Sequence, residues 1–268
     1  MENNNHIIFT AKNIADILFQ KKTVSNLELI GGATYIPSLP EKSLSIRGIP
    51  ELSLIDKHER YIDFGPAVTL NNILHMGINF LPSVLYEAIS SISNYAVRNM
   101  ATIGGNIMAR DTRLTLSAPL IALGTTLKFR SQKNIDIIPL VKFTSIPADS
   151  ILVNIRIPTD DWNIEIFRRL GPSNKISNES CSFCFLANTE KKVLINLKIC
   201  FSGPFIFTSK ELETRYLGTK LPLSNSTIDE FISMANKEFD EHTKDLQYNP
   251  IIKRQFSNLL AYSLHELT

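Results

Sequence analysis

VRNMATIGGNI, residues 97–107, is the stretch that decides how this chain is interpreted. It places Gly104 and Gly105 side by side between the short polar residues Thr102 and Asn106. Glycine adopts positive φ without steric cost and lets a ligand touch the main chain, so successive N–H groups can form a concave nest for an anion. A glycine pair at a strand-to-loop corner is also a common turn. The pattern therefore predicts either a backbone site for phosphate or pyrophosphate or an ordinary turn.

A second glycine pair, in Gly31-Gly32-Ala33-Thr34, favours the anion site. It follows the apolar residues 27–30, which are expected to form a short strand that ends in a glycine-rich turn. An α/β sheet commonly meets a nucleotide at such a strand end. We predict that both glycine pairs lie in loops and that the two loops hold one pyrophosphate through backbone N–H groups.

The composition is that of a globular protein, because 44% of the 268 residues are hydrophobic, and the length corresponds to about two domains. The 28 basic and 26 acidic residues give a net charge of +2, and they are scattered, so there is no electrostatic footprint for nucleic acid. The start MENNNH is polar, and no apolar run of about 18 residues could cross a membrane. We expect a soluble, cytoplasmic protein that binds neither nucleic acid nor membrane.

The cysteines Cys181, Cys184 and Cys200 are too few for a disulfide framework. Cys181 and Cys184 form one CxxC, but a metal site needs further ligands that this region does not supply. The surrounding residues also indicate a strand, in which positions three apart point to opposite faces. We therefore expect buried structural cysteines and no metal site.

Local patterns predict an alternation of strands and helices over the first 160 residues. The expected elements are a helix over residues 7–19 with Thr10 as its N-cap, parallel strands at 27–30 and 43–46, a strand at 61–70 that passes into a helix at Thr69, an amphipathic helix over 85–93, a hairpin of 125–130 with 135–139, and a strand at 151–157. The last strand alternates and stops at Pro158, which is typical of a strand that tolerates a sheet edge.

A domain boundary is expected at Asp160-Asp161-Trp162. Beyond it we expect strands at 164–170, 181–187 and 193–201, followed by helices at 228–240 and 250–267. Strands followed by helices within about 100 residues indicate a separate small α+β domain.

Four segments carry a resemblance to a known family. They are the glycine turn at 29–36, FGPAVT at 64–69, residues 92–107 with the specific signature VRNMATIGGN, and FRR at 167–169. On these segments, and over its whole length, the chain resembles the FAD-binding medium subunit of the molybdenum hydroxylases, the family of xanthine dehydrogenase and carbon monoxide dehydrogenase. The absence of a GxGxxG fingerprint agrees with this, because two separate glycine loops replace a single helix N-terminus.

The resemblance implies an α+β fold in two parts. An FAD-binding domain of the vanillyl-alcohol-oxidase (PCMH) type would cover 1–160, with subdomains of about 1–54 and 55–160 that hold FAD between them. A small α+β C-terminal domain with a three-stranded antiparallel sheet plus helices would cover 161–268.

The resemblance also implies which residues bind the cofactor, with no catalytic residue among them. They are Leu29, Ile30, Gly31, Gly32, Ala33, Thr34, Tyr35, Ile36, Ile92, Thr102, Ile103, Gly104, Gly105, Asn106, Thr115, Leu152 and Arg168. Ile92 would lie near the flavin ring, Leu152 against the isoalloxazine, and Arg168 where members often have a lysine. Ile92 and Leu152 equally fit ordinary core positions, and Arg168 equally fits a solvated surface charge.

One position departs from the family pattern. Pro119 stands thirteen residues after Asn106 as the family requires, but the aspartate that members often carry four residues before this proline is Thr115 here. A carboxylate that could bind the cofactor is therefore missing. Asp111 stands one turn earlier and is a possible substitute, although a solvated loop charge is the simpler interpretation.

The leading functional hypothesis is an electron-transfer subunit of a xanthine dehydrogenase-like complex. FAD would receive electrons from an iron–sulfur small subunit and pass them to NAD or another acceptor, while a molybdenum-cofactor large subunit oxidises the substrate. The alternative is a non-catalytic scaffold subunit that has lost FAD or binds it weakly. A free-standing flavin oxidase or reductase is a third hypothesis, which the lack of an extended substrate domain disfavours.

Overall fold

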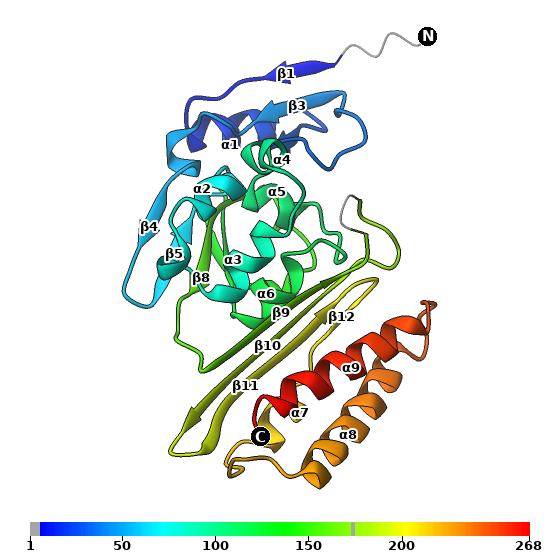
Figure 1. The fold of residues 1–268 in the computed structure, drawn as a ribbon. Coiled ribbons are helices and arrows are strands. Elements are labelled where there is room, and N and C mark those ends of the chain that lie inside the picture. The colour runs from blue at the N-terminus through cyan, green and yellow to red at the C-terminus, as the bar shows by residue number, and fades with distance from the viewer. Residues whose placement is uncertain (1–5, 173–174) are drawn as a thin grey trace. The chain divides into compact units, whose positions relative to one another are not determined.

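The structure, a computed structural model, describes residues 6–172 and 175–268 and divides the chain into two compact units (Figure 1). Unit 1 consists of Met1–Leu81, Ser93–Arg110 and Gly124–Asp160, and unit 2 of Pro82–Ile92, Asp111–Leu123 and Asp161–Thr268. The chain passes from unit 1 to unit 2 for the last time between Asp160 and Asp161, where the domain boundary is expected. Residues 1–5 of the polar N-terminal stretch lie outside the described residues.

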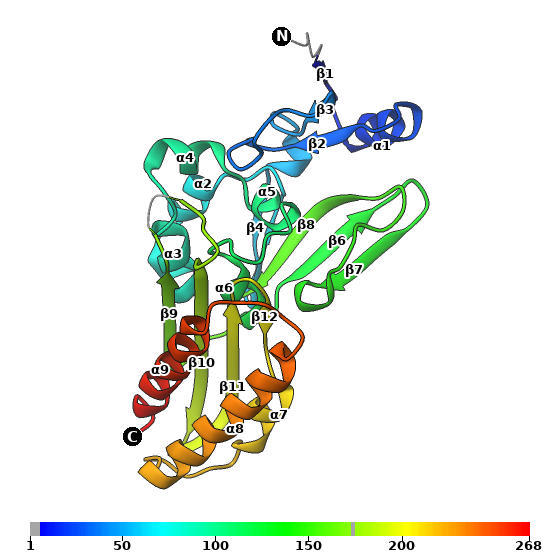
Figure 2. The same cartoon turned by 90° about the vertical axis from the view of Figure 1, so that its right-hand side faces the viewer.

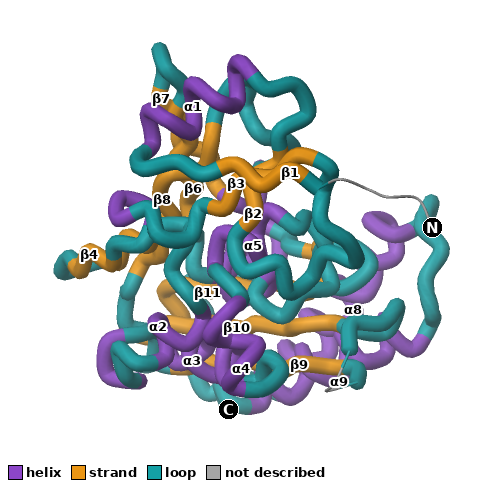
Figure 3. The backbone as a smooth tube through the Cα atoms, turned by 90° about the horizontal axis from the view of Figure 1, so that it is seen from above, coloured by secondary structure: helices purple, strands orange, loops and turns teal. Residues whose placement is uncertain are grey.

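Unit 1 begins with a small parallel sheet in the order β1-β3-β2 (Figure 3). Its elements are β1 (Ile7–Phe9), α1 (Ile14–Thr23), β2 (Glu28–Ile30) and β3 (Lys42–Ser45). The predicted parallel pairing of β2 with β3 is confirmed. The single helix predicted over residues 7–19 is wrong, because Ile7 pairs with Lys42 of β3 and the helix begins only after Asn13, whose side chain caps it.

A five-stranded antiparallel sheet with the order β4-β5-β8-β6-β7 completes the β-structure of unit 1. Its strands are β4 (Ile55–Lys57), β5 (Tyr61–Phe64), β6 (Thr126–Arg130), β7 (Ile135–Pro139) and β8 (Ile151–Pro158). The predicted β6–β7 hairpin is confirmed. The predicted strand β8, whose sequence would tolerate a sheet edge, lies in the centre of the sheet, and Pro158 is accommodated there because it is the last residue of the strand.

Short helical turns connect these strands. They are η1 (Pro50–Leu52), α2 (Leu70–Leu74), η2 (Ile78–Phe80), α4 (Tyr95–Met100), α5 (Ile103–Met108) and η3 (Leu140–Lys142). Thr69 caps α2 as predicted, by accepting a hydrogen bond from the N–H of Asn72. The strand-to-loop corner predicted at residues 97–107 is wrong, because this stretch forms α4 and α5, with Thr102 as the N-cap of α5.

Unit 2 is built on a four-stranded antiparallel sheet in the order β12-β11-β10-β9. Its strands are β9 (Ile164–Leu170), β10 (Cys181–Glu190), β11 (Val193–Ser202) and β12 (Ile206–Phe207). The three long strands β9, β10 and β11 were predicted, but the prediction of a three-stranded sheet is wrong, because β12 adds a fourth strand. A tight turn at Gly203, whose N–H donates to Phe205 O, folds the two-residue strand β12 back onto β11.

Helices cover both faces of this sheet. The helices of unit 2 are α3 (Ser83–Ser90), α6 (Ser117–Ala122), α7 (Lys210–Arg215), α8 (Asn225–Thr243) and α9 (Ile251–His265). Helices α8 and α9 run across one face of β10 and β11 (Figure 2), and α3 and α6 contact the strands β9, β10 and β11 from the other. Unit 2 therefore contains two helices from earlier in the sequence than the strands they cover.

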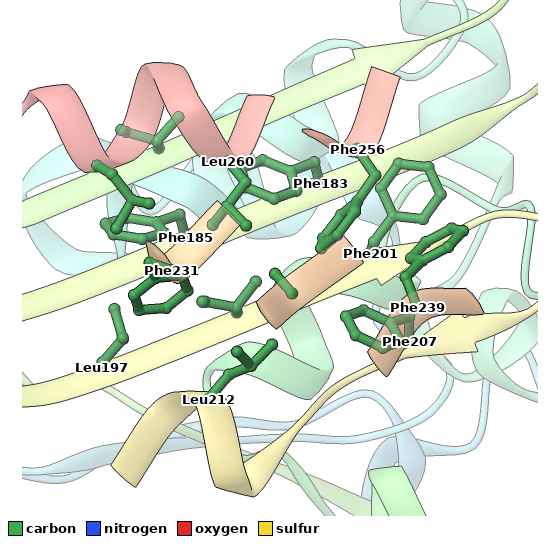
Figure 4. Packing of buried hydrophobic residues seen from close by; sticks show 14 of the residues in the cluster. Phe183, Phe185, Leu197, Phe201, Phe207, Leu212, Phe231, Phe239, Phe256 and Leu260 are labelled. Atoms are coloured by element: carbon green, nitrogen blue, oxygen red, sulfur yellow. The ribbon is translucent and has the colours of Figure 1, made fainter. Parts of the chain in front are cut away.

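The core of unit 2 is rich in phenylalanine (Figure 4). Alternate residues of β10 and β11, such as Phe183, Phe185 and Phe201, meet Phe239 of α8 and Phe256 of α9. The rings pack mostly edge to face, at centroid distances that include 5.7 Å between Phe201 and Phe256. This burial explains why the predicted helices at the C-terminal end dock on the sheet.

None of the helices within the described residues has both the length and the apolar character that a bilayer-spanning segment needs.

Candidate cofactor site

The two glycine segments of unit 1 lie directly against each other. We call residues 29–36 the first glycine segment and residues 102–106 the second glycine segment. A Cβ atom added to Gly32 would lie 1.7 Å from the carbonyl oxygen of Met100, and one added to Gly31 would lie 2.5 Å from Thr102 Oγ1. Only residues without a side chain permit this approach, so the glycines of the first segment are explained by close packing on the turn before α5.

The second glycine segment does not bind an anion in the way predicted from its sequence. The N–H groups of Ile103 and Gly104 donate to Val68 O and Pro66 O, and that of Gly105 donates to Thr102 Oγ1 at 3.0 Å. These glycines also have no left-handed φ. The expected nest of N–H groups at Gly104 and Gly105 is therefore wrong. Gly104 instead lets α5 lie against Pro66, because a Cβ added to Gly104 would lie only 2.4 Å from the Cβ of Pro66.

The first glycine segment has the opposite character. Within the described residues, the backbone N–H groups of Gly31, Gly32, Ala33 and Thr34 donate no hydrogen bond. Ala33 has a left-handed φ of 52°, a conformation that is uncommon for a residue with a Cβ. Consecutive unpartnered N–H groups beside such a residue form a concave donor set for an anion, and strained backbone is found at functional sites more often than elsewhere.

The surroundings of this donor set favour negative charge. Residues 29–40 and residues 93–110 contain no aspartate or glutamate, and the second stretch contains Arg98 and Arg110. Arg47 stands close to the same place, with Nη1 3.0 Å from Met100 Sδ. Asn106 lies on α5, four residues after the capping residue Thr102, and its side chain carries a neutral amide donor. The donors present fit a pyrophosphate.

The other predicted site residues are divided between the units. Leu152 belongs to unit 1, where it is buried on β8 and pairs with Phe129 of β6. Ile92, Thr115 and Arg168 belong to unit 2. Ile92 follows α3, and Thr115 is 5% exposed just before α6.

Arg168 lies exposed on β9. Its Nη1 donates to the carbonyl oxygen of Phe167 at 2.8 Å, and its guanidinium stands 5.4 Å from the ring of Tyr262. The guanidinium of Arg168 is therefore exposed to solvent, as in the surface-charge interpretation, but it also contacts the protein through Phe167 and Tyr262.

Asp111 is not the solvated charge expected from its loop position. Its side chain is only 12% exposed and forms a two-point ion pair with Arg113, at 2.8 Å to Nε and 2.6 Å to Nη2. Arg113 also donates to Asn178 Oδ1. A carboxylate held in this way is directed to Arg113. The hypothesis that Asp111 binds the cofactor in place of the aspartate missing at position 115 therefore loses support.

The three cysteines are free and buried, as expected. Burial raises the pKa of Cys181 to about 12 and also raises the pKa values of Cys184 and Cys200. Cys184 and Cys200 are cross-strand partners on β10 and β11, and Cys181 belongs to the core on the face that α8 and α9 cover. Within the described residues no group of three or more His, Cys, Asp or Glu side chains could hold a metal ion.

Sequence reasoning missed three contributors to the site. Met100 supplies the carbonyl against which Gly32 packs, Pro66 supplies the surface for Gly104, and Arg47 supplies a cation. FGPAVT contains Pro66 and was recognised as part of the resemblance, but not as a partner of the second glycine segment. The signal for Arg47 is its position just after a strand that is parallel to the one before Gly31.

Solved structures of a carbon monoxide dehydrogenase and of a quinoline oxidoreductase have the same fold. A carbon monoxide dehydrogenase from Hydrogenophaga pseudoflava that lacks the Mo-pyranopterin moiety of its cofactor matches with a TM-score of 0.81 and 16% identity, over 98% of this chain and 97% of that one. Quinoline 2-oxidoreductase from Pseudomonas putida 86 matches with a TM-score of 0.80 and 13% identity, over 98% of this chain and 96% of that one. The fold is thus one that oxidoreductases use.

Sequence comparison gives the family. A curated relative, indole-3-acetaldehyde oxidase of Zea mays, is 28% identical over 175 residues, which cover 61% of this chain but only 13% of that protein's length. The family model described as FAD binding domain in molybdopterin dehydrogenase matches residues 4–160. The chain belongs to this family of FAD-binding domains of the molybdenum hydroxylases, and FAD is its cofactor.

Proposed function

We propose that this chain is the electron-transfer flavoprotein subunit of a multi-subunit molybdenum hydroxylase of the xanthine dehydrogenase type. Bound FAD accepts electrons singly and releases them in pairs, which connects one-electron donors with a two-electron acceptor. In this proposal an iron–sulfur subunit delivers the electrons, a molybdenum-cofactor subunit oxidises the substrate, and NAD or another acceptor takes the electrons. The assembly is cytoplasmic.

The observation that carries this proposal is the interlocked pair of glycine segments with its row of free N–H groups at Gly31–Thr34. The chain contributes binding and orientation of the flavin, and it needs no acid or base of its own for electron transfer. Among residues 6–172 and 175–268, no group of three or more His, Cys, Asp or Glu side chains could hold a metal ion, and in this proposal the iron–sulfur clusters belong to a partner subunit.

Within this function we propose the following arrangement. Residues 1–160 form the FAD-binding domain, with subdomains of about 1–54 and 55–160, and residues 161–268 form the C-terminal domain. The first glycine segment holds the pyrophosphate, and Thr102 and Asn106 of the second lie on its other side. The family resemblance assigns Ile92, Thr115, Leu152 and Arg168 to cofactor binding as well.

The second candidate is a scaffold subunit that binds FAD weakly. Two observations favour it: Thr115 in place of a carboxylate, and the ion pair that directs Asp111 toward Arg113. Both candidates keep the partner contacts of the complex, and they differ in whether the flavin is retained.

Purification from the native cell distinguishes the two. The electron-transfer subunit should copurify with iron and molybdenum, show a flavin absorption band at about 450 nm, and lose that band anaerobically when NADH is added. Dithionite reduction is the control that gives the full absorbance change. A complex that contains iron and molybdenum but binds no FAD after reconstitution would establish the scaffold, and a chain that turns over NADH alone would establish a free-standing flavoenzyme.

A further inference from the structure

Arg47 lies at the same sheet edge as the first glycine segment. Strands β2 and β3 are parallel, with Ile30 opposite Ser45, and the N–H of Ile46 donates to Ile30 O at 2.9 Å. The chain therefore leaves both strands at one edge, toward Gly31 on one strand and toward Arg47 on the other. Carboxyl ends of parallel strands are where α/β sheets bind nucleotides.

A shared neighbour brings the Arg47 guanidinium close to the glycines. Its Nη1 stands 3.0 Å from the Sδ of Met100, and the carbonyl oxygen of the same Met100 is the atom against which Gly32 packs. Arg47 is exposed, and it has no carboxylate partner within the described residues. A thioether is only a weak acceptor, so the five N–H donors of this guanidinium are largely unsatisfied by the protein.

The neighbouring cations are engaged differently. Arg98 donates through Nη1 to Ser93 O at 3.0 Å, and Arg110 donates through Nη2 to Thr144 O at 2.5 Å. Arg98 thus braces the turn before α4, and Arg110 ties the end of α5 to the segment that follows η3. Arg47 instead contacts a thioether, which leaves the planar edge of its exposed guanidinium available to a ligand.

We propose that Arg47 is a specificity-determining ligand of the cofactor: its guanidinium binds the diphosphate that the Gly31–Thr34 N–H groups cradle. This inference rests on the proposed function of the site. The N–H groups are neutral, whereas the diphosphate carries about two negative charges, so a cation beside them strengthens the binding. The planar fork of arginine matches two phosphate oxygens at once, which a lysine cannot do. The edge of the sheet at the carboxyl ends of β2 and β3 thereby selects a ligand with a diphosphate over a flavin without a diphosphate.

The test compares three ligands on four forms of the full-length chain. Dissociation constants are measured by calorimetry for FAD, ADP and riboflavin, on the apo forms of the wild type, Arg47→Gln, Arg47→Lys and Arg60→Gln. Arg60 is a matched control because it is an exposed arginine of the same unit, and its side chain forms no hydrogen bond or ion pair within the part of the chain that the structure describes. Thermal unfolding of each form shows whether the fold is retained.

We expect Arg47→Gln to weaken FAD and ADP by about tenfold or more, as the loss of a hydrogen bond to a charged group requires, and to leave riboflavin within about twofold. Arg47→Lys should fall between wild type and Arg47→Gln, and Arg60→Gln should match the wild type. The dependence of FAD affinity on salt should also become shallower in Arg47→Gln.

Equal FAD and ADP affinities for wild type and Arg47→Gln would overturn the inference and leave the proposed function standing. A loss of riboflavin binding as large as that of FAD would also overturn it, since Arg47 would then act through the structure. A wild-type chain that binds none of the three ligands would instead remove the proposed function itself.

Discussion

Replacement of Gly32 by alanine tests the close approach of the two glycine segments most directly. The added Cβ would lie 1.7 Å from the oxygen and 2.4 Å from the carbon of the Met100 carbonyl. Nonbonded atoms do not approach within about 3.0 Å, so the first glycine segment or α4 must move by roughly 1.3 Å. Gly32 has no left-handed φ, so alanine is allowed by the backbone and the cost is steric.

The expected cost is that of overpacking against main-chain atoms, about 1 to 3 kcal/mol. The unfolding midpoint should fall by about 2 to 4 °C for each kcal/mol. The displaced N–H groups should also bind FAD at least about tenfold more weakly, because one hydrogen bond to a charged acceptor is lost. Differential scanning calorimetry and FAD titration measure the two effects.

Gly105→Ala is the matched control. Its Cβ would meet one side-chain atom, the capping Thr102 Oγ1 at 2.9 Å, and no main-chain atom, and alanine is favoured over glycine by about 0.5 to 1 kcal/mol inside a helix such as α5. We expect a smaller loss of stability and of FAD affinity than for Gly32→Ala. Identical midpoints and FAD affinities for Gly32→Ala and Gly105→Ala would refute the idea that the site depends on this contact.

Three further predictions concern other parts of the chain. Thr115→Asp should tighten FAD binding by about 1 to 3 kcal/mol if Thr115 contacts the cofactor, and unchanged or weaker FAD titrations would remove that role. Cys181 and the two other buried cysteines should resist a thiol reagent at pH 8 until the chain is unfolded, and rapid labelling of the native chain would contradict this prediction. Because burial raises their folded pKa values, that of Cys181 to about 12, the stability that the buried thiols support should be full below pH 9 and lost as the pH rises toward 12. Urea unfolding across that pH range measures this loss of stability. Glu213→Ala should destabilise the chain by about 1 to 3 kcal/mol, because Glu213 Oε1 accepts a hydrogen bond from the N–H of Ile199. Glu213→Gln keeps an acceptor oxygen and should recover part of the lost stability, as measured by chemical denaturation. Equal losses of stability for both variants would exclude the hydrogen bond as the cause.

Local pattern was sufficient for elements whose contacts are local or repetitive. The alternation of β10 and β11, the capping residue Thr69 and the hairpin at residues 126–139 all follow from spacing that the sequence shows directly. The resemblance supplied the family and the cofactor, which the family match confirms.

Long-range contacts account for what was wrong. Ile7 became a strand because Lys42 pairs with it, which no local window can reveal. Glycine disfavours helices, so α5 was not expected, but Pro66 and Thr102 stabilise its first turn through tertiary and capping contacts. The same contacts consume the N–H groups of Gly104 and Gly105, and for that reason the anion donors remain on the first glycine segment alone.

The way α3 and α6 join the later strands has a consequence for how the protein is made. Both helices leave the ribosome well before the strands β9, β10 and β11, since chains emerge from their N-terminal end at about 5 to 20 residues per second. Until then, Val84, Leu85 and Ile89 of α3, which are fully buried in the finished structure, have no sheet to cover them. A nascent chain stopped at residue 160 would present the same apolar helix face, so expression of this part alone calls for a chaperone or a solubilising fusion.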